Sequence, residues 1–124
     1  MRCFFKDIER VVPIVLPFRE GGEDPWLAYS YALQVPNVYV LMPDSKSVII
    51  YRPVGKNEWD GHIVGTFKSV VASVKWMFDN TECEIISGRP EGSVARWSKK
   101  LAKYVGAIEE NGKFFVRRES CRLL

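Results

Sequence analysis

The spacing of apolar residues predicts two helices in the second half of the chain. From residue 68 to residue 80, apolar side chains recur three and four positions apart, which is the period of a helix with one buried face. The positions are Val70, Val71, Val74, Met77 and Phe78. A second helix is predicted to begin at Ser93 and to end at Gly106, because glycine commonly follows the last turn of a helix. Its expected buried residues are Val94, Trp97, Leu101, Tyr104 and Val105.

Runs of β-branched and aromatic residues predict the strands. Residues 37–42, 47–54 and 59–67 form three such runs separated by turn-forming residues, which predicts an antiparallel meander. A short apolar strand is expected at residues 83–87. The last strands form a hairpin over residues 107–118, where Asn111-Gly112 is the signal for a type I′ turn.

The first third of the chain has a weaker pattern. Residues 1–5 are compatible with a short strand, and residues 6–12 with one or two helical turns that Pro13 and Pro17 then break. The helical turns would bury Ile8, Val11 and Val12. A further helix is expected over residues 25–35, with Asp24 as its N-cap, Pro25 at its first position, and Pro36 and Asn37 at its end.

The predicted order, with a possible first strand, is β-α-α-β-β-β-α-β-α-β-β. Strands that are joined through helices run parallel, whereas the meander and the hairpin are antiparallel. We therefore expect an α+β fold with a single mixed sheet, two crossover helices and a C-terminal hairpin. No linker, repeat or low-complexity tract divides the chain, so residues 1–124 form one domain.

Composition narrows the class of protein. Hydrophobic residues make up 47% and charged residues 27% of the chain, which is typical of a folded soluble domain. A net charge of +3 is too small to predict nucleic-acid binding. Cys3, Cys83 and Cys121 form no C-x-x-C pair, so neither a disulfide framework nor a metal site is expected. No signal peptide or membrane span is expected, and a reducing cytoplasm is the expected location.

The stretch "WMFDNTECEIISGRPEG" at residues 76–92, followed by a helix that ends in "KYVGA", resembles small acetyltransferase-like proteins of bacteriophages. These have the GNAT-type N-acetyltransferase fold, and the resemblance to that fold covers roughly residues 37–118. Over its whole length the chain is similar to the head assembly proteins of short-tailed enterobacterial phages. That resemblance implies a role in virion assembly and phage structural or ejection proteins as partners.

The same resemblance indicates where a cofactor would bind. In GNAT enzymes, backbone N–H groups between the fourth strand and the third helix hold the coenzyme A diphosphate, and the pattern there is Arg or Gln, two residues, Gly, one residue, then Gly or Ala. Here the stretch is "GTFKSVVAS", in which Gly65 lies too early and bulky residues follow. If acetyl-CoA binds at all, Phe67, Lys68, Ser69 and Val70 are the residues expected to hold it.

The family's general acid also has no counterpart. A tyrosine four residues before the closing glycine protonates the departing thiolate in many of these enzymes, and that position is Ala102 here. Tyr104 lies about 200° further around the helix. The position of the asparagine at the start of the family's helix falls near Ala95. We therefore expect no catalytic residue of the family type.

Three further groups of residues have two interpretations each. Glu58, Asp60 and His62 alternate on one side of a predicted strand and form either a base for an amine substrate or a solvated polar face. Four basic residues lie on one side of the last predicted helix, and we call them the basic stripe: Arg96, Lys99, Lys100 and Lys103. The basic stripe contacts nucleic acid or an acidic protein, or it only faces solvent. A surface tryptophan would anchor a protein contact, or it would pack on the flank of the sheet; the candidates are Trp26, Trp59 and Trp76.

The sequence therefore leads to one main hypothesis and two alternatives. The main hypothesis is a phage head or ejection-protein assembly factor that binds protein, with no enzymatic activity and no cofactor. The first alternative is an active N-acetyltransferase that uses acetyl-CoA. The second is a small DNA-binding module, whose binding would weaken steeply with salt.

Overall fold

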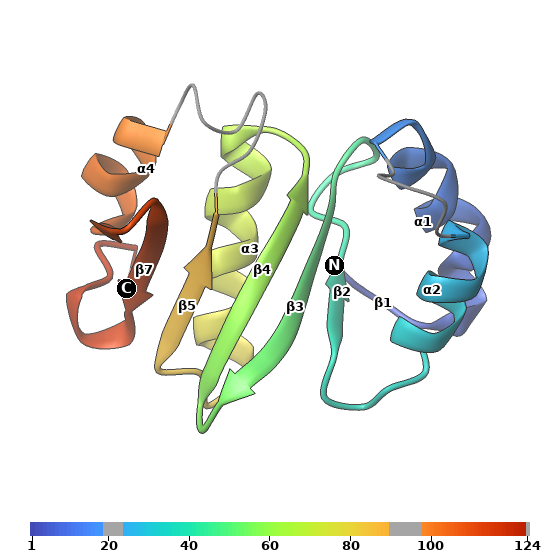
Figure 1. Cartoon of the computed structure of the whole chain (residues 1–124), viewed down its shortest axis with the longest axis horizontal. Coiled ribbons are helices and arrows are strands. Elements are labelled where there is room, and N and C mark those ends of the chain that lie inside the picture. Colours follow the sequence, from blue (N-terminus) through green and yellow to red (C-terminus); the bar gives the residue numbers. More distant parts are fainter. Residues whose placement is uncertain (19–23, 90–97, 124) are drawn as a thin grey trace.

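The computed structural model describes residues 1–18, 24–89 and 98–123, and its centre is a seven-stranded sheet with the order β1-β2-β3-β4-β5-β7-β6 (Figure 1). The strands are β1 (Arg2–Cys3), β2 (Tyr39–Leu41), β3 (Val48–Gly55), β4 (Glu58–Val64), β5 (Ile85–Gly88), β6 (Ile108–Glu110) and β7 (Lys113–Arg117). The helices are α1 (Ile8–Val15), α2 (Pro25–Ala32), α3 (Phe67–Asn80) and α4 (Ser98–Val105). Among the described residues, 3-10 turns lie at Phe5–Asp7, Leu16–Phe18 and Arg118–Ser120.

The sheet is mixed, as expected from the sequence. The strands β2, β3 and β4 form the antiparallel meander, and β6 and β7 form the C-terminal hairpin. The strands β4 and β5, which α3 connects, pair in parallel from Glu58↔Ile85 to Gly61↔Gly88. These observations confirm the α+β class with one mixed sheet.

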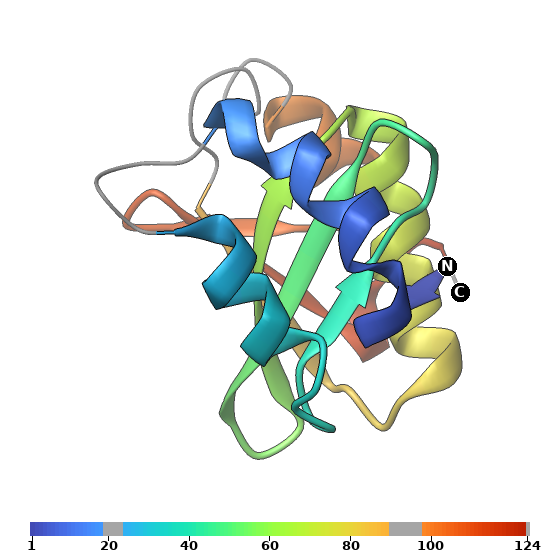
Figure 2. The ribbon, with the colours of Figure 1, turned by 90° about the vertical axis from the view of Figure 1, so that its right-hand side faces the viewer.

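Two apolar clusters cover the two faces of the sheet. Successive residues of a strand point to opposite faces, and β3 follows this rule. Ile50 packs with α1 and α2, whereas Ile49 and Tyr51 pack with α3 and α4. In Figure 2 the pair α1 and α2 lies in front of the sheet and α3 lies behind it. The protein therefore has three layers, with helices on both sides.

Turn residues have the backbone conformations that the sequence indicates. Asn111 and Gly112 both have positive φ angles, 54° and 76°, as a type I′ turn requires. Gly106 ends α4 with a φ of +83°, and a Cβ there would lie 2.5 Å from the Ser120 carbonyl oxygen. Asp24 caps α2, because its carboxylate accepts a hydrogen bond from the Trp26 N–H at 3.0 Å.

Several predicted boundaries are wrong. Pro13 does not break the first helix, which continues to Val15 because Val11 and Val15 are buried and their packing outweighs the lost hydrogen bond. The helix predicted to reach Val35 ends at Ala32. The third strand of the meander stops at Val64, since Thr66 caps a helix that begins at Phe67.

The burial predictions also need three corrections, the first of which is Ile8, which is only partly buried. Tyr104 is 59% exposed, because it lies beside the stripe of Leu101 and Val105 through which α4 packs on the core. Val71 is only partly buried. The predicted start of that last helix at Ser93, together with Val94 and Trp97, lies outside the described residues. Within the described residues, no helix combines the length and the apolar character needed to cross a bilayer.

Candidate functional site

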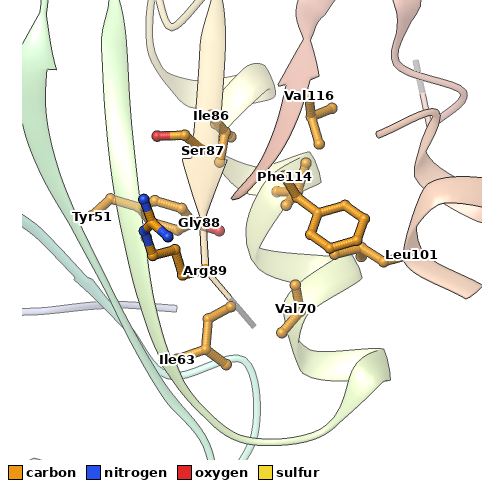
Figure 3. Close-up of a pocket in the computed structure, with 12 residues that line it drawn as sticks. Tyr51, Ile63, Val70, Ile86, Ser87, Gly88, Arg89, Leu101, Phe114 and Val116 are labelled. Carbon is orange, nitrogen blue, oxygen red and sulfur yellow. The ribbon is translucent and has the colours of Figure 1, made fainter. Parts of the chain in front are cut away.

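A small apolar cavity lies at the carboxyl end of the parallel pair β4–β5 (Figure 3). Its volume is about 40 Å³. Ligands of open α/β sheets commonly bind beyond the carboxyl ends of parallel strands, so this is the place to look for a ligand site. Residues from the sheet and both neighbouring helices line it, among them Tyr51, Gly61, Val70, Ile86, Leu101 and Phe114.

The Tyr51 side chain forms one wall of this cavity and is held rigidly. Its ring lies against Gly61, where a Cβ would be 2.8 Å from Tyr51 Cε1. The hydroxyl lies 2.7 Å from Ser73 Oγ, which in turn donates to the Val70 carbonyl oxygen at 2.8 Å. Because the Ser73 proton is used in this way, Tyr51 donates to Ser73. Burial raises the pKa of Tyr51, so its hydroxyl stays protonated at neutral pH.

The first turn of α3 is capped by its own side chains. Thr66 Oγ1 accepts a hydrogen bond from the Ser69 N–H at 3.2 Å, and Ser69 Oγ accepts one from the Thr66 N–H at 2.9 Å. The Val70 N–H donates to the Thr66 carbonyl oxygen. Capping of this kind satisfies donors that would otherwise be available to a bound anion.

The residue before this cap is packed closely from two sides. A Cβ on Gly65 would lie 2.5 Å from Ser69 Oγ and 2.7 Å from Ser47 Oγ. Ser47 Oγ is buried and has no hydrogen-bond partner among the residues that the structure describes. Because Gly65 has no side chain, the side chains of Ser47 and Ser69 can pack against its backbone, and they fill the space beside it.

The four residues predicted to hold a cofactor have separate roles in the structure. Phe67 packs edge-on against Tyr104, with ring centroids 5.7 Å apart. Lys68 is exposed, Ser69 belongs to the cap, and Val70 is buried and lines the cavity. The four residues therefore do not form a single surface around one ligand.

The polar residues of β4 are not joined to one another in the described part of the chain. Asp60 Oδ1 accepts a hydrogen bond from Ser87 Oγ at 2.9 Å and lies 3.5 Å from Lys113 Nζ. His62 is exposed, and no hydrogen bond or ion pair within the described residues joins it to Glu58 or Asp60. This arrangement matches the interpretation of a solvated polar face.

Two of the three candidate tryptophans support the sheet. Trp59 and Trp76 both pack against Tyr39, at centroid distances of 6.3 and 5.9 Å. Trp26 is different, since it is 43% exposed on α2. It is the candidate that remains available as a contact anchor among the three.

The sequence did not reveal the surface to which Trp26 belongs. Leu27 and Tyr31 lie one helical turn apart on α2, and each is 73% exposed. We call Trp26, Leu27 and Tyr31 the α2 face. No residue from position 25 to position 42 carries a charge, and this absence is the signal in the sequence that would have indicated the surface.

The basic stripe of the last helix is exposed where the structure describes it. Lys99, Lys100 and Lys103 all face solvent, whereas Arg96 lies outside the described residues. Tyr104 lies one helical turn after Lys100, so the lysines adjoin the pair of Tyr104 and Phe67. The sequence alone did not predict this aromatic pair.

All three cysteines are free and buried. Burial raises the pKa of Cys3, and it raises the pKa of Cys83 to about 11. A thiol with a raised pKa is a poor nucleophile at neutral pH. Among the residues that the structure describes, no group of His, Cys, Asp and Glu side chains is arranged to hold a metal ion.

Comparison with known proteins gives no relative: no protein-family model, curated protein or solved structure matches this chain.

Proposed function

We propose that this protein is a phage virion assembly factor that acts by binding another protein, on an acetyltransferase-like scaffold that no longer transfers acetyl groups. It works in the host cytoplasm, and its partner is a phage structural or ejection protein. The phage context rests on the resemblance of the sequence. The observation that supports protein binding is the α2 face.

The α2 face has the chemistry of a binding surface. Each large apolar side chain that a partner buries fully contributes about 1.5–3 kcal/mol, and Leu27 and Tyr31 are almost entirely available for this. Tryptophan and tyrosine are over-represented at the centres of protein interfaces. Because the surface carries no charge, the matching partner surface is apolar and uncharged.

The geometry around α3 argues against coenzyme A. A diphosphate held on backbone N–H groups needs main chain without side chains in the way. Here Ser47 and Ser69 occupy the space beside Gly65, and Phe67 and Tyr104 pack beside the first turn of α3. The cavity at β4 and β5, about 40 Å³, is far smaller than the roughly 300–1,000 Å³ of pockets that hold small-molecule ligands.

The position of the expected general acid supports the same conclusion. Ala102 is partly buried and has no proton to give. Tyr104 points to solvent and against Phe67, not into the cavity of β4 and β5. Ala95 lies outside the described residues.

One observation favours the alternative, an active N-acetyltransferase. The cavity lies at the carboxyl ends of two parallel strands, where a sheet of this kind commonly binds its ligand. Calorimetric titration with acetyl-coenzyme A separates the two functions. We expect no heat of binding, and an affinity in the micromolar range would establish the alternative.

Protein binding is tested by site-specific photo-crosslinking in infected cells. A photoreactive amino acid at position 31 should capture a phage structural or ejection protein, and Leu27→Ser should reduce the yield. The matched control carries the same amino acid at position 104, since Tyr104 is also an exposed tyrosine on a helix. Equal capture from both positions, or no virion protein at position 31, would contradict the proposal.

A further inference from the structure

A second, larger cavity lies between β1, the turn Phe5–Asp7 and α1, and its volume is about 260 Å³. The segment that forms it faces the viewer in Figure 2. Residues from all three elements line it, among them Arg2, Phe4, Lys6, Asp7 and Arg10. It is distinct from the cavity at β4 and β5 and from the α2 face.

The lining of this cavity is strongly cationic. Lys6 and Arg10 line it together with a single acidic residue, Asp7, and Arg2 lines it at the start of β1. The carboxylate is already used, because Asp7 Oδ2 accepts a hydrogen bond from the Phe4 N–H at 2.9 Å and Oδ1 lies 3.3 Å from Arg10 Nη1. Positive charge in the cavity therefore exceeds negative charge, which favours an anion.

The Arg2 guanidinium is held by contacts beside the cavity. Its Nη2 donates to the Pro36 carbonyl oxygen at 3.0 Å, and its central carbon lies 4.2 Å from the ring centroid of Tyr39 and 5.2 Å from that of Phe4. Arg2 pairs with Leu41, so its side chain lies on the α3 side of the sheet, whereas Cys3 points toward α1. Arg2 therefore adds positive charge near the cavity, and the donors available to a ligand are those of Lys6 and Arg10.

The other two cations extend into solvent. The Arg10 side chain is 68% exposed, and its bond to Asp7 leaves further N–H donors. Lys6 is exposed and makes no hydrogen bond or ion pair with the described residues. The two side chains can therefore turn toward a ligand without breaking the fold.

We propose that this cavity binds a phosphate group, carried by a small soluble ligand or by a phospholipid headgroup. Arginine pairs with phosphate through two parallel hydrogen bonds, and Lys6 adds a point charge. The volume is slightly below that of cavities for drug-sized ligands, which suits a phosphate with a small substituent. Phe4, which lines the cavity, and Phe5, the next residue, are each 49% exposed and would meet the acyl chains of a lipid.

The test uses the full chain and inorganic phosphate as the first probe, at low ionic strength. Titration followed by NMR should shift the amide signals of residues 2–10, with little change elsewhere. Lys6→Gln should weaken binding by about tenfold, the loss expected for one charge-assisted hydrogen bond. The matched control is Lys99→Gln on α4, which removes the same charge from another exposed site and should leave the affinity unchanged.

A second variant, which should tighten phosphate binding instead of weakening it, completes the test. Asp7→Asn keeps an oxygen that can accept from the Phe4 N–H but removes the negative charge, so phosphate should bind more tightly. If Lys99→Gln weakens binding as much as Lys6→Gln, the attraction is general and the proposal fails. Amide shifts spread over the whole chain would contradict it in the same way.

Vesicles separate the two sources of phosphate. Binding to vesicles of phosphatidic acid in phosphatidylcholine, lost in Lys6→Gln and retained in Lys99→Gln, assigns the site to a lipid headgroup. Binding of inorganic phosphate without vesicle binding assigns it to a soluble ligand. If neither probe binds at millimolar concentration, the proposal is wrong.

Discussion

The hydroxyl groups of Tyr51 and Ser73 lie 2.7 Å apart inside the protein and join β3 to α3. Tyr51 is 1% exposed and Ser73 is fully buried, so water does not compete for this bond. The Ser73 hydroxyl donates a hydrogen bond to the Val70 carbonyl oxygen, and the three groups form a short series of hydrogen bonds. Substitutions of Tyr51 and of Ser73 should therefore change the free energy of unfolding by different amounts.

Removing the Tyr51 hydroxyl should cost less than removing the Ser73 hydroxyl. Tyr51→Phe leaves Ser73 bonded to Val70 and should lower the free energy of unfolding by about 1 kcal/mol. Ser73→Ala leaves the Tyr51 hydroxyl buried without an acceptor and should cost about 1–3 kcal/mol. Urea unfolding of both variants and of the double variant measures this. A Tyr51→Phe loss larger than that of Ser73→Ala would contradict the assigned direction of the bond.

Removing the hydroxyl of Ser47, a second buried serine, should not destabilise the protein. Ser47 Oγ is buried without a partner, so Ser47→Ala removes an unsatisfied hydroxyl and should leave the free energy of unfolding unchanged or raise it by up to about 1 kcal/mol. Ser73→Ala serves as the control, since it deletes the same atom from a bonded site. A large loss of stability for Ser47→Ala would mean that this hydroxyl has a partner in solution.

Stability should decrease in mildly alkaline solution because of Cys83. Burial raises the pKa of this thiol to about 11, whereas a thiol in the unfolded chain titrates near 8.5. The stabilisation is complete below the unfolded pKa and is lost as the pH rises toward the folded pKa. Between pH 8.5 and 10, the free energy of unfolding should fall by up to about 1.4 kcal/mol per pH unit.

Urea unfolding at pH 8, 9 and 10 measures this dependence. Cys83→Ala should reduce its slope even if the variant is less stable at every pH. Tyr51→Phe is the control within this range, because an unfolded tyrosine titrates only near pH 10. Wild type and Cys83→Ala with equal slopes would contradict the prediction.

Arg118 should be needed for stability, in contrast to its neighbour. Its Nε donates to the Cys83 carbonyl oxygen at 2.8 Å and its Nη2 to that of Thr81 at 2.9 Å, which secures the segment between α3 and β5. Lysine cannot make both bonds, so Arg118→Lys should cost about 1.5–3 kcal/mol. The exposed Arg117 gives the matched control, and Arg117→Lys should change thermal unfolding little.

The sequence correctly predicted those elements whose apolar residues recur on one face only. In α3 the stripe of Val70, Val74 and Met77 identifies both the helix and its buried face, and these residues are buried. The positive φ angles of Asn111 and Gly112 follow from the sequence alone in the same way. Local chemistry decides such elements, so no knowledge of distant contacts is needed.

The sequence predicted the structure less well where contacts between residues far apart in the chain determine it. Pro13 lies within a helix because Val11 and Val15 are buried against the sheet, which local rules do not include. The helix α2 is apolar on all sides, so no period separates the buried Ala32 from the exposed Leu27. The large cavity was not predicted because its cations lie on different elements that only the fold brings together.

The two outer strands of the sheet restrict how any partner can attach. At one margin β1 has two residues, and at the other β6 has three. Adding a strand from another molecule requires a longer row of open backbone groups than these margins provide. The proposed partner would therefore be recognised through side chains, and the shortness of both margins disfavours self-association into extended β-structure.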